Sequence, residues 1–304
     1  MRSRDEHGAV AVIVAVLMVP LVGFVALAVD VSAAYVTRVQ LQNGADAAAL
    51  AVAADCLSGA CGSSATTART FASANFPKGT PTTTITAQTA SSVTVQNSAV
   101  QSYLFAPVLG IRSATVSAKG TATWTGPTSG TAIPVAINLC EYNYFTGGLP
   151  PSGTTSRTMR LSTTSASSCP AASGEGGYSY LKVNSTACRT TTAVGAEFQT
   201  EPGDSEPSSC SSFSFDSLIN TTILLPVFSS ARKQGNTSYL KVYGYAAFRL
   251  TGYYFGSGYS YNASCNGSER CLRGYFTTLH ERSAAFTYGS GAPQLGAASV
   301  TLSD

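Results

Sequence analysis

Residues 8–55, GAVAVIVAVLMVPLVGFVALAVDVSAAYVTRVQLQNGADAAALAVAAD, decide the architecture of this chain. No charged residue occurs from Gly8 to Val29. At helical rise residues 9–29 span about 31 Å, the thickness of a hydrocarbon core. From Asp30 to Asp55, apolar residues recur at steps of three and four, which is the helical period. The sequence therefore predicts one helix over 8–55, with a first half suited to lipid and a second half suited to a partner or a globular domain.

The apolar stretch has two interpretations, a cleaved signal peptide or a retained membrane helix. Ala26-Leu27-Ala28 offers a cleavage site of the small-x-small kind. However, the stretch is longer than the usual apolar region of a signal peptide, and the helical pattern continues beyond the site. We therefore expect the helix to be retained, as a plain anchor with a helical stalk or as part of an assembly.

The basic residues near the apolar stretch predict its orientation. Arg2 and Arg4 precede it and Arg38 follows it. Because cytoplasmic flanks carry the excess of Lys and Arg, residues 1–7 are expected to be a cytoplasmic tail. The chain is then a single-pass protein of the cell membrane, with its bulk outside the cytoplasm.

The composition excludes several classes of protein. Only 11% of the 304 residues are charged, against roughly 25% in ordinary soluble domains, which disfavours a cytosolic enzyme. The 18 basic and 15 acidic residues give a net charge of +3 without a basic cluster, so we expect no nucleic-acid partner. An apolar content of 44% is enough for a core.

The pattern beyond the long helix predicts an α+β fold in two parts. The first part, residues 56–125, is expected to be a small α+β domain, and residues 126–131 (GPTSGT) a linker. The second part, 132–304, has regular short strands and is expected to be a β-rich, sandwich-like or open-barrel domain. Within the first part, the expected order is a helix over 63–76, strands over 82–89 and 91–96, a short helix over 99–110 and a strand over 114–124.

Eight cysteines in an exterior chain are best explained by four disulfides. Spacing suggests the pairs Cys56–Cys61 and Cys265–Cys271, which bracket short turns. Cys188–Cys210 and Cys140–Cys169 would close longer loops, but eight cysteines allow 105 connectivities, so other pairings stay open. Zinc is the competing interpretation; the spacings are too long for it, and His7 and His280 are isolated. We expect no metal and no cofactor.

No pattern of catalytic residues stands out, and we expect no enzymatic activity. Gly203-Asp204-Ser205 is similar to the nucleophile block of some esterases, but it lies between Pro202 and Pro207, where a turn explains it. An envelope-anchored hydrolase would have to use His280. The tyrosines of 239–261 could bind glycan, although tyrosines facing a β core are the simpler explanation.

The N-terminal segment resembles the TadE/TadG-like Flp pilus-assembly proteins. In that family a charged leader and a Gly precede an apolar helix, followed by Asp-Val-(Gly/Ser), a Tyr and a Leu-Gln-Asn-(Ala/Gly)-Ala-Asp-Ala-Ala-Ala-Leu-Ala signature. The matching signature residues in this chain are Asp30, Tyr35, Leu41, Gln42, Asn43, Ala45 and Asp46. Residues 133–142 and 239–255 are similar, more weakly, to actinobacterial members.

The resemblance implies a membrane-anchored component of the machinery that assembles tight-adherence (Tad/Flp) pili. Its implied partners are other Tad/Flp assembly proteins or pilin, together with the membrane. Related pseudopilins are cut after a Gly, and Gly8–Ala9 offers such a site, but Ile13 replaces the Glu expected five residues into the mature chain. A minor pseudopilin built into the fibre is therefore the alternative. The metal motif of some members stops after Asp30-Val31-Ser32, so no metal site is carried over.

Overall fold

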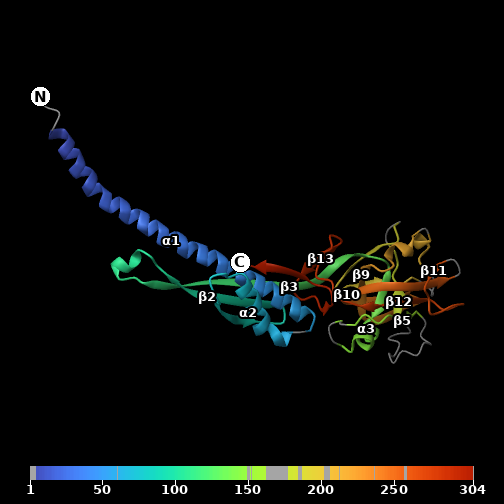
Figure 1. Ribbon diagram of the computed structural model, residues 1–304. Coiled ribbons are helices and arrows are strands. Elements are labelled where there is room, and N and C mark those ends of the chain that lie inside the picture. Colours follow the sequence, from blue (N-terminus) through green and yellow to red (C-terminus); the bar gives the residue numbers. More distant parts are fainter. Residues whose placement is uncertain are drawn as a thin grey trace. The chain divides into compact units, whose positions relative to one another are not determined.

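The computed structural model describes residues 5–59, 61–148, 151, 153–161, 177–183, 187–201, 206–211, 213–235, 237–256 and 259–303. The chain forms two compact units. The first consists of Met1–Val52, Ser63–Ala122 and Leu302–Asp304, and the second of Ala53–Gly62 and Thr123–Thr301. A long apolar helix followed by β-rich structure is the mixed α+β class that the sequence predicts (Figure 1).

The first unit is built on the long N-terminal helix, a second helix and three neighbouring strands. Helix α1, Asp5–Leu57, continues through Pro20 without a break. The second helix, the strands and two short 3-10 helices are α2 (Ser64–Ala74), β1 (Thr82–Gln88), β2 (Ser92–Ser102), β3 (Ser113–Ala132), η1 (Cys61–Ser63) and η2 (Ala106–Leu109). Strand β2 lies between β1 and β3.

Strand β2 shows why this sheet forms against a helix. Its residues alternate between buried and partly exposed, as expected for a strand with one covered face. Val93 and Val95 are fully buried on the covered face, and Asn97 follows them at the same spacing. The hydroxyl-rich opposite face faces solvent, so the apolar face that the sequence predicts for this strand is confirmed.

Two expected elements in this region are wrong. Residues 126–131, expected as a linker, lie inside strand β3, where they pair with β13 and β7. The ladder hydrogen bonds of those partners hold the Gly- and Ser-rich segment extended. The helix expected over 99–110 is also wrong, because residues up to Ser102 belong to β2 and only η2 is helical. Gly110, with a φ of 85°, ends η2 after one turn.

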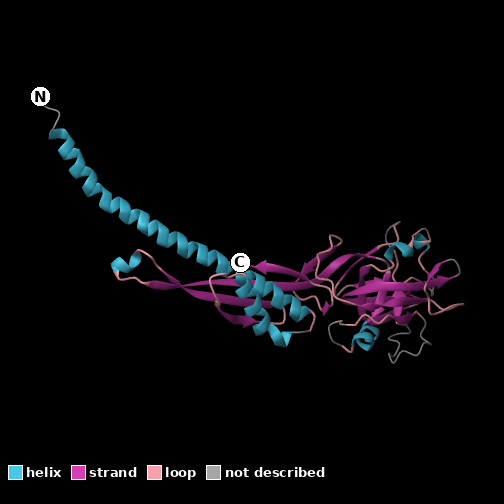
Figure 2. Cartoon of the chain, in the orientation of Figure 1, coloured by secondary structure: helices cyan, strands magenta, loops and turns pink. Residues whose placement is uncertain are grey.

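The second unit is dominated by β-structure around a long central strand, β10 (Thr237–Gly256). Hydrogen bonding gives the order β5-β12-β10-β9-β4-β6, with β8, β11 and β14 also paired to β10. The elements are β4 (Val135–Asn138), α3 (Leu139–Thr146), β5 (Arg157–Arg160), β6 (Tyr178–Tyr180), β7 (Thr190–Ala193), β8 (Glu197–Gln199), η4 (Ser208–Cys210), η5 (Phe215–Leu218), β9 (Thr222–Gln234), β11 (Tyr259–Tyr261), β12 (Cys271–Phe276), β13 (Phe286–Gly289), β14 (Gln294–Leu295) and β15 (Ser299–Ser303) (Figure 2).

Large aromatic side chains fill the core of the second unit. Phe248 of β10 and Phe276 of β12 pack edge to face with their ring centroids 5.2 Å apart. Phe215 packs in the same way against Phe255 at 4.8 Å. Edge-to-face pairs add stabilisation beyond the area they bury. The strand period is interrupted within β10: Tyr245 is buried and bonded to Thr192, whereas Tyr243, two residues earlier, is exposed, because the pairing with β9 shifts register between Val242 and Gly244.

Disulfides reinforce the second unit. In the part of the chain that the structure describes, three are present: Cys56–Cys61, Cys188–Cys210 and Cys265–Cys271. The two pairs that the spacing suggested, Cys56–Cys61 and Cys265–Cys271, are confirmed, and so is Cys188–Cys210, one of the two longer pairings that stayed open. The fourth expected pair, Cys140–Cys169, includes Cys169, which lies outside the described residues.

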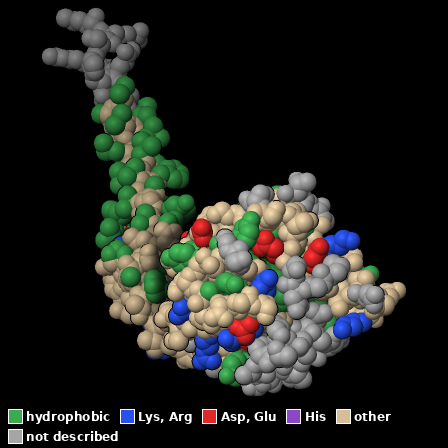
Figure 3. Space-filling model, turned by 90° about the vertical axis from the view of Figure 1, so that its right-hand side faces the viewer, with side chains coloured by type: hydrophobic (Ala, Val, Ile, Leu, Met, Phe, Trp, Pro, Cys, Tyr) green, Lys and Arg blue, Asp and Glu red, His purple; other side chains and the backbone are tan. Residues whose placement is uncertain are grey.

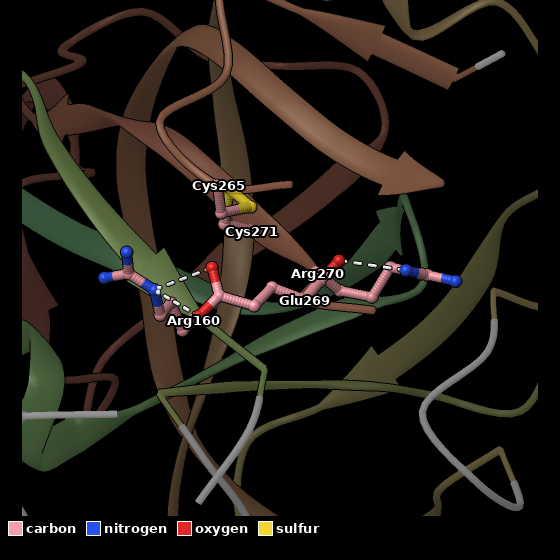
Figure 4. A network of polar contacts seen from close by, with 5 residues as sticks. All are labelled: Arg160, Cys265, Glu269, Arg270 and Cys271. Atoms are coloured by element: carbon pink, nitrogen blue, oxygen red, sulfur yellow. Dashed lines mark hydrogen bonds and ion pairs between the residues drawn. A yellow bond between two sulfur atoms is a disulfide. The ribbon is translucent and has the colours of Figure 1, made fainter. Parts of the chain in front are cut away.

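A polar network lies beside one of these disulfides. Figure 4 shows Arg160 of β5 and Glu269 pointing toward one another next to Cys265–Cys271, with Arg160 Nε 3.4 Å from the Glu269 carboxylate. Arg270 donates to the Glu269 carbonyl oxygen at 2.9 Å. Both partners of the ion pair are partly exposed, so the pair contributes at most about 1 kcal/mol. The pair joins the turn before β12 to β5.

Candidate functional site along helix α1

Helix α1 carries two different surfaces along its length. Its most apolar 18-residue window has a mean hydropathy of 3.0 and is not buried at all, so it is a candidate membrane span by length and composition. Val19 is 75% exposed and Phe24 is 70% exposed. Figure 3 shows hydrophobic side chains on the projecting part of this helix. Water would solvate such a surface poorly, whereas a hydrocarbon environment suits it.

The second half of α1 is packed into the first unit. Leu41 contacts Phe76 and Ala118, and Ala45, Ala48, Ala49 and Val52 are fully buried on the same side of the helix. These positions recur at steps of three and four, so one stripe of the helix faces the sheet and α2. The Ala-rich sequence therefore belongs to a core and not to a free stalk.

Small residues let the backbones approach closely at this contact. A Cβ added to Gly120 of β3 would lie 2.6 Å from the backbone carbonyl carbon of Ala45 and 2.5 Å from Oδ1 of Asp46. A Cβ on Gly44 would lie 3.1 Å from the carbonyl oxygen of Ala72 in α2. Larger side chains at these positions would push the helix away from both neighbours. The contact thus depends on Gly on both sides.

The polar signature residues tie the helix to the strands. Gln42 Nε2 donates to Asp46 Oδ1 at 2.9 Å and to the carbonyl oxygen of Lys119 at 2.7 Å. Asn97 Nδ2 of β2 donates to the carbonyl oxygen of Leu41 at 3.3 Å. The structure therefore brings Leu41, Gln42, Ala45 and Asp46 together at one contact.

Asp30 marks the end of the apolar half and holds the loop that joins β2 to β3. Its side chain is 4% exposed although it follows a fully exposed apolar segment. One carboxylate oxygen accepts the backbone N–H of Leu104 at 2.8 Å, and the other accepts those of Phe105 at 3.0 Å and Ala106 at 2.7 Å. An ionised carboxylate accepting several N–H groups is a strong anchor.

A second polar contact lies about two turns further along α1. Thr37 is buried and its hydroxyl donates to Gln101 Oε1 of β2 at 2.6 Å. Lys78 Nζ donates to the same hydroxyl at 3.4 Å. Together with Asp30, these bonds fix the end of β2 to the helix just beyond the apolar segment.

Two signature residues remain on the surface of the first unit. Tyr35 is 68% exposed, and Asn43 is also exposed. Their side chains therefore play no part in the core contact and stay accessible from outside the unit. Gly8 and Ala9 lie inside α1, and cleavage between them stays the alternative that the sequence raises.

The sequence did not single out the β2–β3 loop as part of the site. Its sequence, YLFAPVLGIR at 103–112, is apolar up to Arg112 although loops between strands are usually polar. That unusual composition was the available signal. The contact with Asp30 joins residues more than 70 positions apart, and no local pattern could reveal it.

Within the described residues, the candidates for catalysis or metal binding are not brought together into a site. Among those residues, no group of His, Cys, Asp or Glu is arranged to hold a metal ion. His280 is half-buried, and desolvation lowers the pKa of its imidazole. Gly203, Asp204 and Ser205 lie outside the described residues.

These features define a class of protein: one with a long N-terminal helix that is apolar and exposed in its first half and part of a β-rich α+β fold in its second. Residues 8–55, the segment that forms both surfaces, match the family described as "putative Flp pilus-assembly TadE/G-like". The N-terminal segment is therefore similar to this family, and the match covers that segment alone. The match leaves out residues 133–142 and 239–255, and neither a curated protein nor a solved structure matches the chain.

Proposed function

We propose that the chain is a non-enzymatic structural or assembly component of the Tad/Flp pilus machinery. It is anchored in the cell membrane by the apolar half of α1, with residues 1–7 in the cytoplasm and the β-rich bulk outside. The observation that carries this proposal is the coincidence of the TadE/G-like segment, residues 8–55, with the helix that has one exposed apolar half and one packed half.

The division of the signature residues supports an assembly role. Those that face inward fasten the helix to β2, β3 and Phe76, so the helix leaves the membrane as part of a folded unit. Tyr35 and Asn43 face outward on the part of α1 that follows the apolar segment. We assign to these two side chains the contact with other Tad/Flp assembly proteins or with pilin.

Deletion of the gene and complementation test the proposed role. The deletion is expected to abolish surface Flp pili, counted by electron microscopy, and the wild-type gene should restore them. Complementation with Tyr35→Ala or Asn43→Ala should restore fewer pili while the protein accumulates normally. Leu50→Ala, a change elsewhere on the same helix, is the matched control and should complement fully. Normal piliation in the deletion strain would overturn the proposal.

The mature N-terminus distinguishes an anchored assembly protein from a pseudopilin. We expect mass spectrometry of the protein from cells to find residues 1–8 retained, because Ile13 replaces the Glu that pseudopilins use. A chain that begins at Ala9 would favour the pseudopilin, and one that begins near Val29 would indicate a signal peptide.

The non-enzymatic part of the proposal has its own test. The purified chain is screened with ester, peptide and glycan substrates, together with His280→Ala, and no turnover is expected from either. Turnover that depends on His280 would favour an envelope-anchored hydrolase instead.

A further inference from the structure

We propose that the loop between β2 and β3, residues 103–112, inserts into the outer leaflet of the membrane beside α1. We call this loop the tip. The inference rests on the proposed membrane anchoring of α1 and adds a second point of contact with lipid. The tip and the apolar half of α1 both belong to the first unit of the fold.

The tip presents an apolar surface to its surroundings. The exposed fractions are 90% for Val108, 78% for Leu109, 76% for Leu104, 53% for Ile111 and 47% for Phe105. Contiguous exposed apolar surface is unfavourable in water and marks a site of contact with another apolar phase. Single exposed apolar residues are common, but five within eight positions of one loop need an explanation.

The position of the tip indicates that this apolar phase is the lipid bilayer. A groove of about 370 Å³ separates the tip from α1 and is lined by Phe105, Ala106, Val108 and Leu109 on one side and by Val19, Val22, Gly23, Ala26, Leu27 and Asp30 on the other. Val19 lies about 16 Å along the helix axis from Asp30, roughly half the thickness of a hydrocarbon core. Where α1 crosses the bilayer, the tip lies alongside it at the depth of one leaflet.

Most of the backbone N–H groups of the tip have hydrogen-bond partners within the protein, as an environment without water requires. Lipid offers no hydrogen-bond partners, so each unpaired N–H costs several kcal/mol there. Asp30 accepts the N–H groups of 104, 105 and 106, and Pro107 has none to satisfy. Further N–H groups are paired within the tip: Tyr103 with Arg112 O, Val108 with Phe105 O, Gly110 with Pro107 O and Ile111 with Ala106 O.

This internal pairing favours lipid over water or a protein partner as the occupant. A loop in water could leave its N–H groups to the solvent, and a protein partner could supply acceptors.

The residues at the base of the tip also fit a membrane surface. Tyr103 and exposed Arg112 lie there, and exposed Tyr35 and Arg38 lie on the adjacent turns of α1. Tyrosine and basic side chains are typical of the interface between lipid and water.

Quenching of tryptophan fluorescence by brominated lipid measures the depth of the tip. The full chain is reconstituted in phosphatidylcholine vesicles whose acyl chains carry bromine, and three single variants are compared with the wild type. Val108→Trp reports on the tip, Phe24→Trp on the span, and Ala90→Trp on the exposed β1–β2 turn at the other end of β2. The one native tryptophan, Trp124, is buried in the second unit and supplies a constant background.

The proposal predicts that Val108→Trp and Phe24→Trp lose most of their added emission in brominated vesicles, while Ala90→Trp loses none. Quenching of Phe24→Trp without quenching of Val108→Trp would overturn the insertion of the tip and leave the anchoring intact. Absence of quenching at both positions would overturn the anchoring and the tip together. If the tryptophan of Val108→Trp is shielded from water only at a high protein-to-lipid ratio, a second copy of the chain covers the tip, and the lipid proposal is wrong.

Discussion

Oδ2 of Asp30 accepts a hydrogen bond of 2.7 Å from the backbone N–H of Ala106, a residue 76 positions further along the chain. The same carboxylate also holds the N–H groups of Leu104 and Phe105. One side chain at the end of the apolar segment therefore sets where the β2–β3 loop lies. This contact makes the loop part of the end of the first unit that carries the apolar segment.

Removal of the Asp30 carboxylate should release the loop. Asp30→Ala leaves three N–H groups without their acceptor, which should cost at least about 2 kcal/mol and raise amide exchange at residues 104–106. Exchange is measured by mass spectrometry on the reconstituted chain. The control is Ser32→Ala, whose exposed hydroxyl bonds only to its own helix, at Val29 O. Unchanged exchange in Asp30→Ala would show that the carboxylate does not hold the loop.

Two leucines of α1 provide a matched pair for the packed surface. Leu41 is 1% exposed against Phe76 and Ala118, whereas Leu50 is 37% exposed. Leu41→Ala leaves a cavity and should cost about 2–5 kcal/mol of unfolding free energy. Leu50→Ala shortens a side chain that is less buried, so it should cost about 1 kcal/mol of unfolding free energy. Thermal unfolding of the full chain in micelles compares them, and equal losses would mean that the second half of α1 is not packed in this way.

Gly120 is expected to tolerate no side chain. The Cβ of Gly120→Ala would lie within 2.6 Å of the α1 backbone at Ala45 and Asp46, so the strand or helix must shift. Overpacking of this kind costs about 1–3 kcal/mol. Gly62→Ala is the control, because its Cβ would meet nothing within 4 Å. A stability of Gly120→Ala equal to that of the control would contradict the close contact between α1 and β3.

Glu141 should make the second unit less stable as the pH rises. Burial raises the pKa of its carboxyl group, and Oε2 has no hydrogen-bond partner where the structure describes the chain. In the unfolded chain this group loses its proton at its ordinary pKa, whereas the folded chain keeps the proton to higher pH. Stability therefore falls across that interval. Glu141→Gln removes the effect, so its advantage over the wild type in unfolding midpoint should grow as the pH rises above the ordinary pKa of the carboxyl group.

Glu197 supplies a control of opposite sign for the pH experiment. Hydrogen bonding to Arg232 lowers the pKa of the Glu197 carboxyl group; Arg232 Nη2 lies 2.7 Å from Glu197 Oε2. The stability from this pair is present above the ordinary pKa and is lost as the pH falls. Glu197→Gln should therefore lose stability at neutral pH and match the wild type in acid, by a small amount because the pair is partly exposed. The same pH trend in both variants would contradict this account.

Local patterns in the sequence were sufficient for much of the fold. The unbroken apolar run and the three- and four-residue period predicted α1 within a few residues of its ends, because helical hydrogen bonds join neighbours in the chain. Alternation predicted the buried Val93 and Val95, because successive side chains of a strand point to opposite faces of the sheet. Short spacings also suggested Cys56–Cys61 and Cys265–Cys271, where few residues separate the sulfur atoms.

Only the tertiary structure decided how these elements meet. Gly120 lies against Ala45, Gln42 reaches Lys119 and Asp30 holds Ala106, and each contact depends on the pairing of strands far from the helix in sequence. Likewise, the Gly- and Ser-rich residues 126–131 are a strand because β7 and β13 supply their hydrogen bonds. The sequence alone determined a long helix with two environments. Packing determined which of its signature residues contact the strands and which stay on the surface, and that an apolar loop lies beside its exposed half.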